Sequence, residues 1–326
     1  MPQQIAIRFA KFHGLHNDFI VARGSHLPRP LSRLAQAITH RHAGLGADGF
    51  LVVLEPRYPA HDARVRFFNA DGSEAEMSGN GIRCVGAFLL PPGRKPRRLQ
   101  IETRAGVKTL EPVRVPSERG PLEWTFRVSM GEPIFDPARI PFRAAQTAPP
   151  IVDFPLALRH RTLRATVTSM GNPHCSIFVD DFESLDWRAL GQEIERSRFF
   201  PRRTNVEFIK VISKQEIEVR FWERGVGETA SSGTGSCGAA VASILNGRTE
   251  RTVRVQTSAG SLLITWPEDG EVSLTGPAIA IAEGKYYWET WPPGAFLRPG
   301  SLFGRCRTNP WLWRVEARDR PQRDIP

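Results

Sequence analysis

The feature that most constrains the fold is an internal repeat. Segments 77–81 (MSGNG) and 231–235 (SSGTG) lie 154 residues apart, and a run of small and apolar residues follows each of them. At nearly the same offset, segment 14–17 (GLHN) corresponds to segment 170–174 (MGNPH). One short match could arise by chance, whereas an ordered set of matches at one offset indicates two homologous lobes. The simplest geometry places the two SGxG loops face to face across a cleft.

Polar residues recur around the two loops as well. Asn69 and Glu223 each stand ten positions before the first glycine of a loop. Glu74 and Glu228 each stand four positions before the serine of a loop. These matches at the same offset strengthen the prediction of two lobes.

The rest of the chain is dominated by short strands that glycine and proline interrupt. This pattern predicts an α+β fold in which sheets wrap around a few buried helices. The expected helices are 31–39, 81–90, 187–195 and 235–246, and the main expected strands are 5–11, 50–55, 65–69, 125–130, 165–170, 175–179, 206–212 and 216–223.

The length of 326 residues exceeds the usual size of one hydrophobic core and favours two domains. We expect an N-terminal lobe over residues 1–126, a C-terminal lobe over 127–275, and a strand over 276–290 that returns to the first lobe. Residues 291–326 are rich in arginine, proline and tryptophan and fit neither lobe. We expect an irregular extension there, which either packs on a lobe through its tryptophans or stays mobile.

The formal net charge of +10 does not by itself predict a nucleic-acid partner. Residues 291–326 hold seven arginines and three acidic residues, so they alone contribute +4. Aromatic residues do not alternate with the basic ones, as a base-stacking surface would require. The sequence shows no signal peptide and no apolar run long enough to cross a bilayer, so we expect a cytoplasmic protein without a membrane partner. Four widely spaced cysteines predict neither a metal site nor a disulfide framework.

The two loops suit the chemistry of an amino-acid α-carbon. In each lobe a strand leads into a glycine-flanked turn and then a helix, so the turn presents free N–H groups at the positive end of the helix. With Gly79 and Asn80 on one side and Gly233 and Thr234 on the other, a carboxylate can lie between two helix N-termini. Such a clamp also stabilises the negative charge that forms when a proton leaves the adjacent carbon.

Longer motifs around these loops resemble the diaminopimelate epimerase family of cofactor-independent amino-acid epimerases. Residues 68–84 (FNADGSEAEMSGNGIRC) are similar to the first signature of that family at all positions but one. Residues 222–229 (WERGVGET), followed by 232–235 (SGTG), resemble the second signature. Shorter matches fall in the family's order, so that the resemblance covers about residues 5–290, and they lie at 11–19, 44–49, 170–174 and 203–208.

The resemblance implies an isomerase that interconverts LL- and meso-2,6-diaminopimelate in lysine and peptidoglycan-precursor biosynthesis, without pyridoxal phosphate or a metal. It implies two pseudo-symmetric lobes, each a small, curled, mostly antiparallel sheet around a central helix, with the active site in the cleft between them. A homodimer is also a family-level expectation.

In the family, one thiolate takes the α-proton and the opposite thiol delivers another to the other face. The two cysteines correspond to Ser78 and Ser232 in this chain. The matching further implies that His174 and Glu223 lie beside the two proton-transfer positions. It assigns the distal end of the substrate to Asn17, Asn69, Asn172, Asn205, Glu223 and Arg224.

Serine at both catalytic positions is the main departure from the family pattern. A serine hydroxyl is far less acidic than a thiol and needs an adjacent base to act. Cys84 and Cys237 do not replace the missing thiols, because they lie in the following helices and are expected to be small buried packing residues. His16 is a second departure, since the family usually has glycine before Asn17, and it can alter that turn.

Three explanations of Ser78 and Ser232 stay open. They are introduced substitutions that trap an inactive enzyme, a natural branch in which His174 and Glu223 activate the serines, or the marks of a protein that lost catalysis and kept amino-acid binding. Diaminopimelate is the favoured ligand, because every inferred ligand of its distal end is retained. The alternatives are another cofactor-independent racemase or epimerase of the superfamily, a catalytically silent amino-acid-binding protein and, least supported, a nucleic-acid-binding module built on residues 291–326.

Overall fold

The computed structural model describes residues 3–143 and 148–290. Residues Ile5–Trp288 form one compact unit. The extension expected at 291–326 lies outside the described residues. Within the part that is described, four α-helices accompany 17 strands, so the predicted α+β class is confirmed. No helix in that part is long and apolar enough to cross a membrane.

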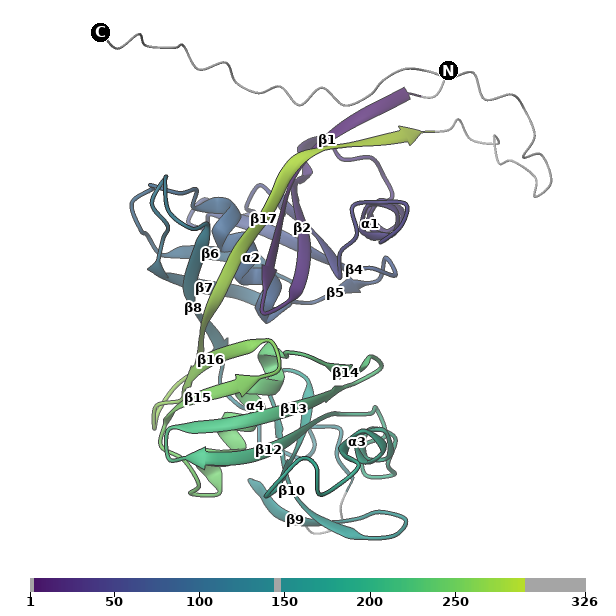
Figure 1. The fold of residues 1–326 in the computed structure, drawn as a ribbon, viewed down its shortest axis with the longest axis vertical. Coiled ribbons are helices and arrows are strands. Elements are labelled where there is room, and N and C mark those ends of the chain that lie inside the picture. Colours follow the sequence, from purple (N-terminus) through teal and green to yellow (C-terminus); the bar gives the residue numbers. More distant parts are fainter. Residues whose placement is uncertain (1–2, 144–147, 291–326) are drawn as a thin grey trace, which may run out of the picture. The chain divides into compact units, whose positions relative to one another are not determined.

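The order of the elements repeats along the chain (Figure 1). The first half contains β1 (Gln3–Gly14), β2 (Asn17–Arg23), the 3-10 helix η1 (Gly24–His26), α1 (Leu31–Thr39), β3 (Gly49–Leu54), β4 (Ala63–Asn69), β5 (Glu74–Ala75), α2 (Gly79–Leu89), β6 (Leu99–Thr103), β7 (Gly106–Arg114) and β8 (Glu123–Gly131). The second half contains β9 (Ile151–Ala157), β10 (Thr162–Ser169), β11 (Pro173–Phe178), α3 (Trp187–Glu195), β12 (Asn205–Ser213), β13 (Glu216–Glu223), β14 (Gly227–Thr229), α4 (Gly233–Leu245), β15 (Thr252–Thr257), β16 (Gly260–Thr265) and β17 (Val272–Thr290).

Strand pairing follows the same repeat. In the first half β2–β3 and β4–β6 are parallel, whereas β1–β2, β3–β4, β6–β7 and β7–β8 are antiparallel. In the second half β11–β12 and β13–β15 are parallel, whereas β10–β11, β12–β13, β15–β16 and β16–β17 are antiparallel. The long strand β17 also pairs with β8 and β1, which closes the first half into a ring of strands. The repeat in the sequence is thus a repeat in topology.

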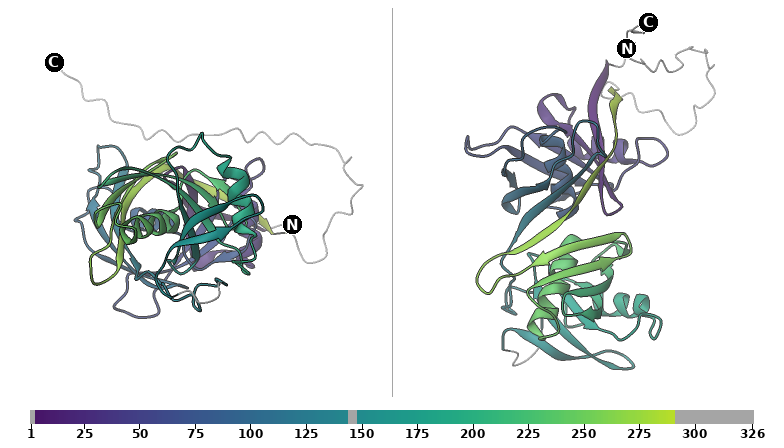
Figure 2. Two further views of the ribbon diagram at one scale, coloured as in Figure 1. Left: turned by 90° about the horizontal axis from the view of Figure 1, so that it is seen from below. Right: turned by 60° about the vertical axis from the view of Figure 1, so that its left-hand side comes forward.

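Each half of the chain packs its strands around one helix. In the second half α4 contacts β10, β11, β12, β13, β15 and β16, and the left-hand view of Figure 2 shows this green helix with strands around it. Small residues allow this close packing. A Cβ at Gly86 of α2 would lie 2.8 Å from the Leu110 side chain, and one at Gly238 of α4 would lie 2.9 Å from the ring of His174. The apolar character of both helices on most sides follows from this central position.

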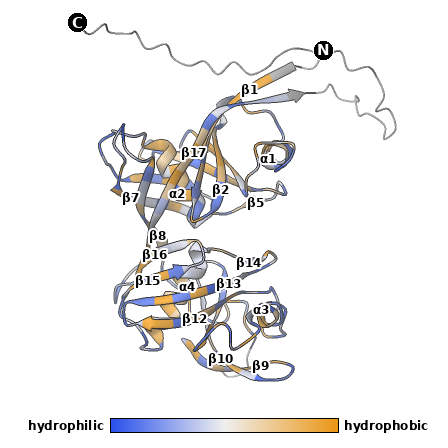
Figure 3. Cartoon of the chain, in the orientation of Figure 1, coloured by the Kyte–Doolittle hydropathy of each residue, from blue (hydrophilic) through white to orange (hydrophobic). Residues whose placement is uncertain are grey.

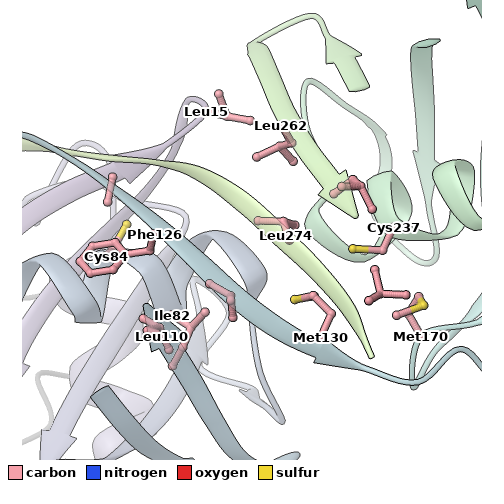
Figure 4. Close-up of a cluster of buried hydrophobic side chains, with 14 of the residues drawn as sticks. Leu15, Ile82, Cys84, Leu110, Phe126, Met130, Met170, Cys237, Leu262 and Leu274 are labelled. Carbon is pink, nitrogen blue, oxygen red and sulfur yellow. The ribbon is translucent and has the colours of Figure 1, made fainter. Parts of the chain in front are cut away.

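The largest hydrophobic cluster draws on both halves. It contains Ile82 and Phe126 from the first half and Phe221 and Cys237 from the second. Figure 4 shows part of this cluster on either side of β17 and β8. In Figure 3, orange hydrophobic residues recur along β10 and β12. Val167 of β10 and Phe208 of β12 belong to a smaller second cluster, whereas Ile209 of β12 belongs to the largest one. The largest cluster is therefore shared by both halves, while the second cluster belongs to the second half and a third cluster, which contains Ile20 and Phe50, belongs to the first half.

Candidate active site

The serines at the two expected catalytic positions occupy equivalent places. Ser78 is the N-cap of α2 (φ −134°, ψ 126°), and its Oγ accepts a hydrogen bond of 3.1 Å from the N–H of Gly81. Ser232 is the N-cap of α4 (φ −132°, ψ 125°), and its Oγ accepts a hydrogen bond of 3.2 Å from the N–H of Gly235. The N-cap position favours serine, because the serine hydroxyl accepts a hydrogen bond from an N–H group that has no acceptor within the helix.

Aromatic rings explain the last glycine of each loop. A Cβ at Gly81 would lie 3.2 Å from the ring of Phe67, and one at Gly235 would lie 2.9 Å from the ring of Phe221. Phe67 and Phe221 are themselves separated by the repeat offset of 154 residues. A larger residue in place of either glycine would push the helix away from its strand.

The two loops lie against each other. A Cβ at Gly79 would be 3.4 Å from Cα of Gly233, and one at Gly233 would be 3.3 Å from Cα of Gly79. A cavity of about 560 Å³ opens between them and contains both Ser78 and Ser232 in its lining. The other sequence-predicted residues that line it are Asn17, Gly79, Asn80, Asn172, Glu223, Arg224, Gly233 and Thr234.

The two serines differ in their acid–base surroundings. The hydroxyl of Ser232 donates to Oε2 of Glu223 at 3.1 Å, and Oε1 of the same carboxylate accepts from the hydroxyl of Thr229 at 2.6 Å. In the described part of the chain, Ser78 has no carboxylate or imidazole within hydrogen-bond distance. A general base is therefore in place beside only one of the two hydroxyls.

His174 is fully buried and is not among the residues that line the cavity. Its Nδ1 lies 2.6 Å from Oε1 of Glu207, and its Nε2 lies 3.0 Å from Oδ1 of Asn172. Burial raises the pKa of Glu207, although the neighbouring imidazole acts in the opposite direction. In this arrangement His174 connects a buried carboxylate to Asn172, and it does not contact Ser78.

Two of the predicted asparagines also lie outside the cavity lining. Asn69 donates from Nδ2 to the hydroxyl of Ser73 at 2.9 Å. Asn205 donates to the carbonyl oxygen of Pro173 at 2.9 Å, and its Oδ1 accepts from the backbone N–H of Arg224 at 3.0 Å. Asn205 thus holds the backbone of a residue that does line the cavity.

Cys84 and Cys237 are fully buried in the core cluster. Burial raises the pKa of each thiol to about 12. A thiol with such a pKa is protonated at neutral pH, and neither residue lines the cavity. Both are packing residues, as the sequence predicts.

Several residues of the cavity region were not selected from the sequence. Ser231 lines the cavity, and its buried hydroxyl has no hydrogen-bond partner in the described residues. Glu74 also lines the cavity, and its carboxylate accepts two hydrogen bonds from the guanidinium of Arg66, at 2.8 and 2.7 Å. Arg83 is completely buried in α2, directly behind the first turn. A charged residue among the apolar residues that follow the first turn of α2 could have indicated a special role from the sequence alone.

Known proteins share both the sequence and the fold of this chain. The family model described as diaminopimelate epimerase matches residues 9–135 and 166–281. A protein named diaminopimelate epimerase from Moorella thermoacetica is 44% identical over 286 residues, which cover 86% of this chain and 99% of that protein. One of the same name from Pelotomaculum thermopropionicum is 45% identical over 290 residues, which cover 87% and 100%.

Two solved structures show the same fold at low sequence identity. A methylitaconate-delta-isomerase superposes with a TM-score of 0.62 at 16% identity, covering 91% of this chain and 99% of that chain. A hydroxyproline epimerase from Agrobacterium vitis, with bound trans-4-hydroxy-L-proline, superposes with a TM-score of 0.61 at 13% identity, covering 89% and 95%.

Proposed function

Because this chain belongs to the diaminopimelate epimerase family, we propose that its cavity binds diaminopimelate between the N-termini of α2 and α4 and exchanges the α-proton there. Membership of this family makes the chain an isomerase that acts on an amino acid, and it places the chain in lysine biosynthesis. The observation that carries the proposal is the cavity between the two loops, which both Ser78 and Ser232 line.

The loops supply what a substrate α-carboxylate needs. The N–H groups of Gly81 and Gly235 are capped by Ser78 and Ser232, whereas those of the first two residues of α2 and α4 have no acceptor inside their own helices and point outward at the positive helix end. Gly79 and Gly233 lie close together and line the same cavity, so N–H groups from both helix ends are available to one ligand. N–H groups that hold the carboxylate there stabilise the negative charge that spreads onto it when the neighbouring carbon loses its proton.

Glu223 makes proton transfer through Ser232 feasible. As the α-proton of the substrate moves to Oγ of Ser232, the hydroxyl proton moves to Oε2 of Glu223, with which it already forms a hydrogen bond of 3.1 Å. No free alkoxide has to form in this step. The carbanion then takes the hydroxyl proton of Ser78 on the opposite face while a water molecule gives its own proton to Oγ of Ser78. The hydroxide left behind takes the proton held by Glu223, which restores the starting state of both serines and of the carboxylate.

The rate follows from the residue types. A thiol loses its proton near neutral pH, especially at a helix N-terminus, whereas a hydroxyl does not. Since only Ser232 has a carboxylate beside it, proton exchange on its face proceeds faster than delivery from Ser78. We therefore expect slow exchange, with more deuterium incorporated with retention than with inversion.

Incubation with LL-diaminopimelate in deuterated water tests the proposal. Mass spectrometry reports deuterium at Cα, and chiral chromatography separates retention from inversion. Ser78→Cys combined with Ser232→Cys should raise inversion by several orders of magnitude, because each proton-transfer group contributes roughly 10²–10⁴-fold. Cys84→Ala is the matched control, since it changes a thiol outside the cavity and should leave exchange unchanged.

The outcomes separate the alternatives. Exchange in the unaltered protein supports catalysis by the serines. A silent protein that binds diaminopimelate and becomes active with both cysteines is an amino-acid-binding protein on an epimerase scaffold. No binding and no exchange in either form would refute diaminopimelate as the ligand.

The distal end of the substrate and the assembly state belong to the same proposal. Arg224 is exposed and lines the cavity, and its guanidinium suits the second carboxylate of diaminopimelate. A monocarboxylic amino acid should therefore exchange more slowly in the same assay. A homodimer, which the family suggests, is tested by light scattering of the full chain.

A further inference from the structure

Arg83 is a buried positive charge without an acidic partner. Its side chain is fully buried, and its three hydrogen bonds reach the carbonyl oxygens of Gly79 (2.8 Å) and Pro277 (3.0 Å) and Oδ1 of Asn80 (2.8 Å). All three acceptors are neutral. Within residues 3–143 and 148–290, no carboxylate forms an ion pair with it.

The fold makes room for this guanidinium with two glycines. A Cβ at Gly14 would lie 3.0 Å from its Nη2, and one at Gly276 would lie 3.3 Å from its Cζ and Nε. The repeat offset of 154 residues pairs Arg83 with Cys237, so α4 has no such charge. A buried guanidinium behind the SGxG loop is therefore present in the first half of the repeat and absent from the equivalent position of the second half.

A buried charge of this kind is costly. Removing an ion from water costs several kcal/mol unless opposite charge and hydrogen bonds compensate. Burial lowers the pKa of Arg83 to about 10, so the group still carries its charge at neutral pH. An apolar side chain would pack in α2 without that cost, which indicates that the charge has a use. The anion that can compensate it is a ligand in the cavity, because two of its acceptors belong to Gly79 and Asn80 of the cavity wall.

Arg83 also fixes the orientation of two side-chain amides. Arginine only donates hydrogen bonds, so the atom of Asn80 that it contacts at 2.8 Å must be the carbonyl oxygen. Nδ2 of Asn80 then donates to Oδ1 of Asn17 at 3.4 Å, and Nδ2 of Asn17 donates to Oδ2 of Asp48 at 2.9 Å. In this chain of hydrogen bonds each residue donates to the next, from Arg83 through Asn80 and Asn17 to Asp48. The remaining N–H groups of Asn80 and Asn17 are donors, which suit a carboxylate and oppose an ammonium group.

We propose that Arg83 is a positioning residue that orients Asn80 and supplies the counter-charge for a substrate carboxylate at the α2 side of the cavity. This role rests on the proposed function above and adds a specificity-determining group to it. It acts through Gly79 and Asn80, since Arg83 itself does not line the cavity. It also gives the two similar loops unequal charge, so that the bound amino acid has a preferred orientation.

Binding of two probes to the full chain tests the role. Isothermal titration calorimetry measures affinity for meso-diaminopimelate and for 1,5-diaminopentane, which has the same two amino groups and no carboxylate. Arg83→Met should weaken diaminopimelate binding by about tenfold or more, because a charge-assisted network is lost, and should not weaken diaminopentane binding. Arg83→Lys keeps the charge and should recover part of the affinity.

Two further variants separate this role from a structural one. Val85→Ala, at a fully buried position of α2 that belongs to the hydrophobic cluster and does not line the cavity, should lower the melting temperature and leave the affinity for diaminopimelate unchanged. Asn80→Asp gives Arg83 an internal carboxylate, so it should raise the melting temperature while it weakens diaminopimelate binding. The rise in melting temperature reports on the charge of Arg83, whereas the loss of affinity is expected from any carboxylate at position 80, because it repels the substrate carboxylate directly.

Three results would overturn the inference, and they differ in what else they refute. If the unaltered protein binds diaminopimelate and Arg83→Met binds it equally well, only the role of Arg83 falls. If Val85→Ala weakens binding as much as Arg83→Met does, the effect of Arg83 is structural and the inference falls. If the unaltered protein does not bind diaminopimelate, the proposed function falls and the inference falls with it.

Discussion

At the scale of single residues, the chemistry of this site depends on what stands beside each hydroxyl. Ser78 and Ser232 have nearly identical backbone conformations and cap equivalent helices. Their difference is Glu223, which contacts only Ser232. Two serines at equivalent positions of the repeat therefore differ in reactivity. The carboxylate of Glu223 makes the side of the cavity at Ser232 the more reactive one.

Glu223→Gln should lower the rate of deuterium exchange by about 10²-fold or more, because the amide cannot accept the hydroxyl proton of Ser232. Exchange is measured by mass spectrometry at Cα. Glu228→Gln is the matched control, since Glu228 lies in the same hairpin, pairs with Arg188 and does not line the cavity. Equal rates in both variants would show that Glu223 is not the base.

The sequence predicts much of this site, and the limits have physical reasons. Ten of the predicted residues line one cavity. The loop residues are recognisable as glycine-flanked turns before helices, whereas Asn17, Asn172, Glu223 and Arg224 were predicted from the resemblance to the family. Asn69, His174 and Asn205 do not line the cavity, since their partners are set by tertiary packing that the sequence pattern does not encode. Arg83 was missed because a charge within an apolar run is usually expected at a surface.

At the scale of elements, the residue at each helix N-cap affects both the stability of the helix and the reactivity of the site, in opposite directions. Serine is a preferred N-cap, and a thiol is a weaker hydrogen-bond acceptor. Ser78→Cys and Ser232→Cys should each lower the free energy of unfolding by about 0.5–1 kcal/mol while they raise exchange. Urea unfolding measures this loss. Ser184→Cys, at an exposed position that caps no helix, should change the unfolding free energy less. A gain in stability from either cap variant would contradict this account.

The turn of the β1–β2 hairpin contains residues that do not suit its backbone conformation. Leu15 and His16 both have positive φ, 52° and 63°, in a two-residue turn between the paired residues Gly14 and Asn17. Such a turn favours glycine, and L-residues in this conformation cost roughly 1–2 kcal/mol. His16→Gly should therefore raise the free energy of unfolding by about 1 kcal/mol.

Thermal and urea unfolding check this prediction. His16→Ala is the matched control, because it removes the imidazole and keeps the backbone cost, so it should give no comparable gain. If alanine stabilises as much as glycine, the imidazole is the cause and the turn geometry is not.

The elements themselves were predicted unevenly. α1, α3 and β13 have the predicted ends, because apolar spacing and a polar cap such as Asp186 mark where they begin and stop. The β6–β7 and β15–β16 hairpins were not predicted. β6 and β15 alternate apolar and polar residues but are only five and six residues long, and β7 and β16 do not alternate regularly.

At the scale of the whole molecule, the two halves of the repeat share their largest hydrophobic cluster. Phe67 and Phe221 are equivalent in the repeat and belong to the same hydrophobic cluster. β17 pairs with β16 of the second half and with β8 and β1 of the first. The two halves should therefore unfold together, although the sequence alone favours two domains.

Phe67→Ala and Phe221→Ala should each shift one common unfolding transition, with a loss of about 3–5 kcal/mol. Far-UV circular dichroism reports all strands, and fluorescence reports the eight tryptophans together, which include Trp124 in the shared cluster and Trp187 in the second one. Coincident transitions for both probes are expected in both variants. Val226→Ala, at a position that is 73% exposed, should leave the midpoint unchanged. If Phe67→Ala separated the two probes while Phe221→Ala did not, the halves would fold as independent units, and the contact between the two loops would not be maintained by a common core.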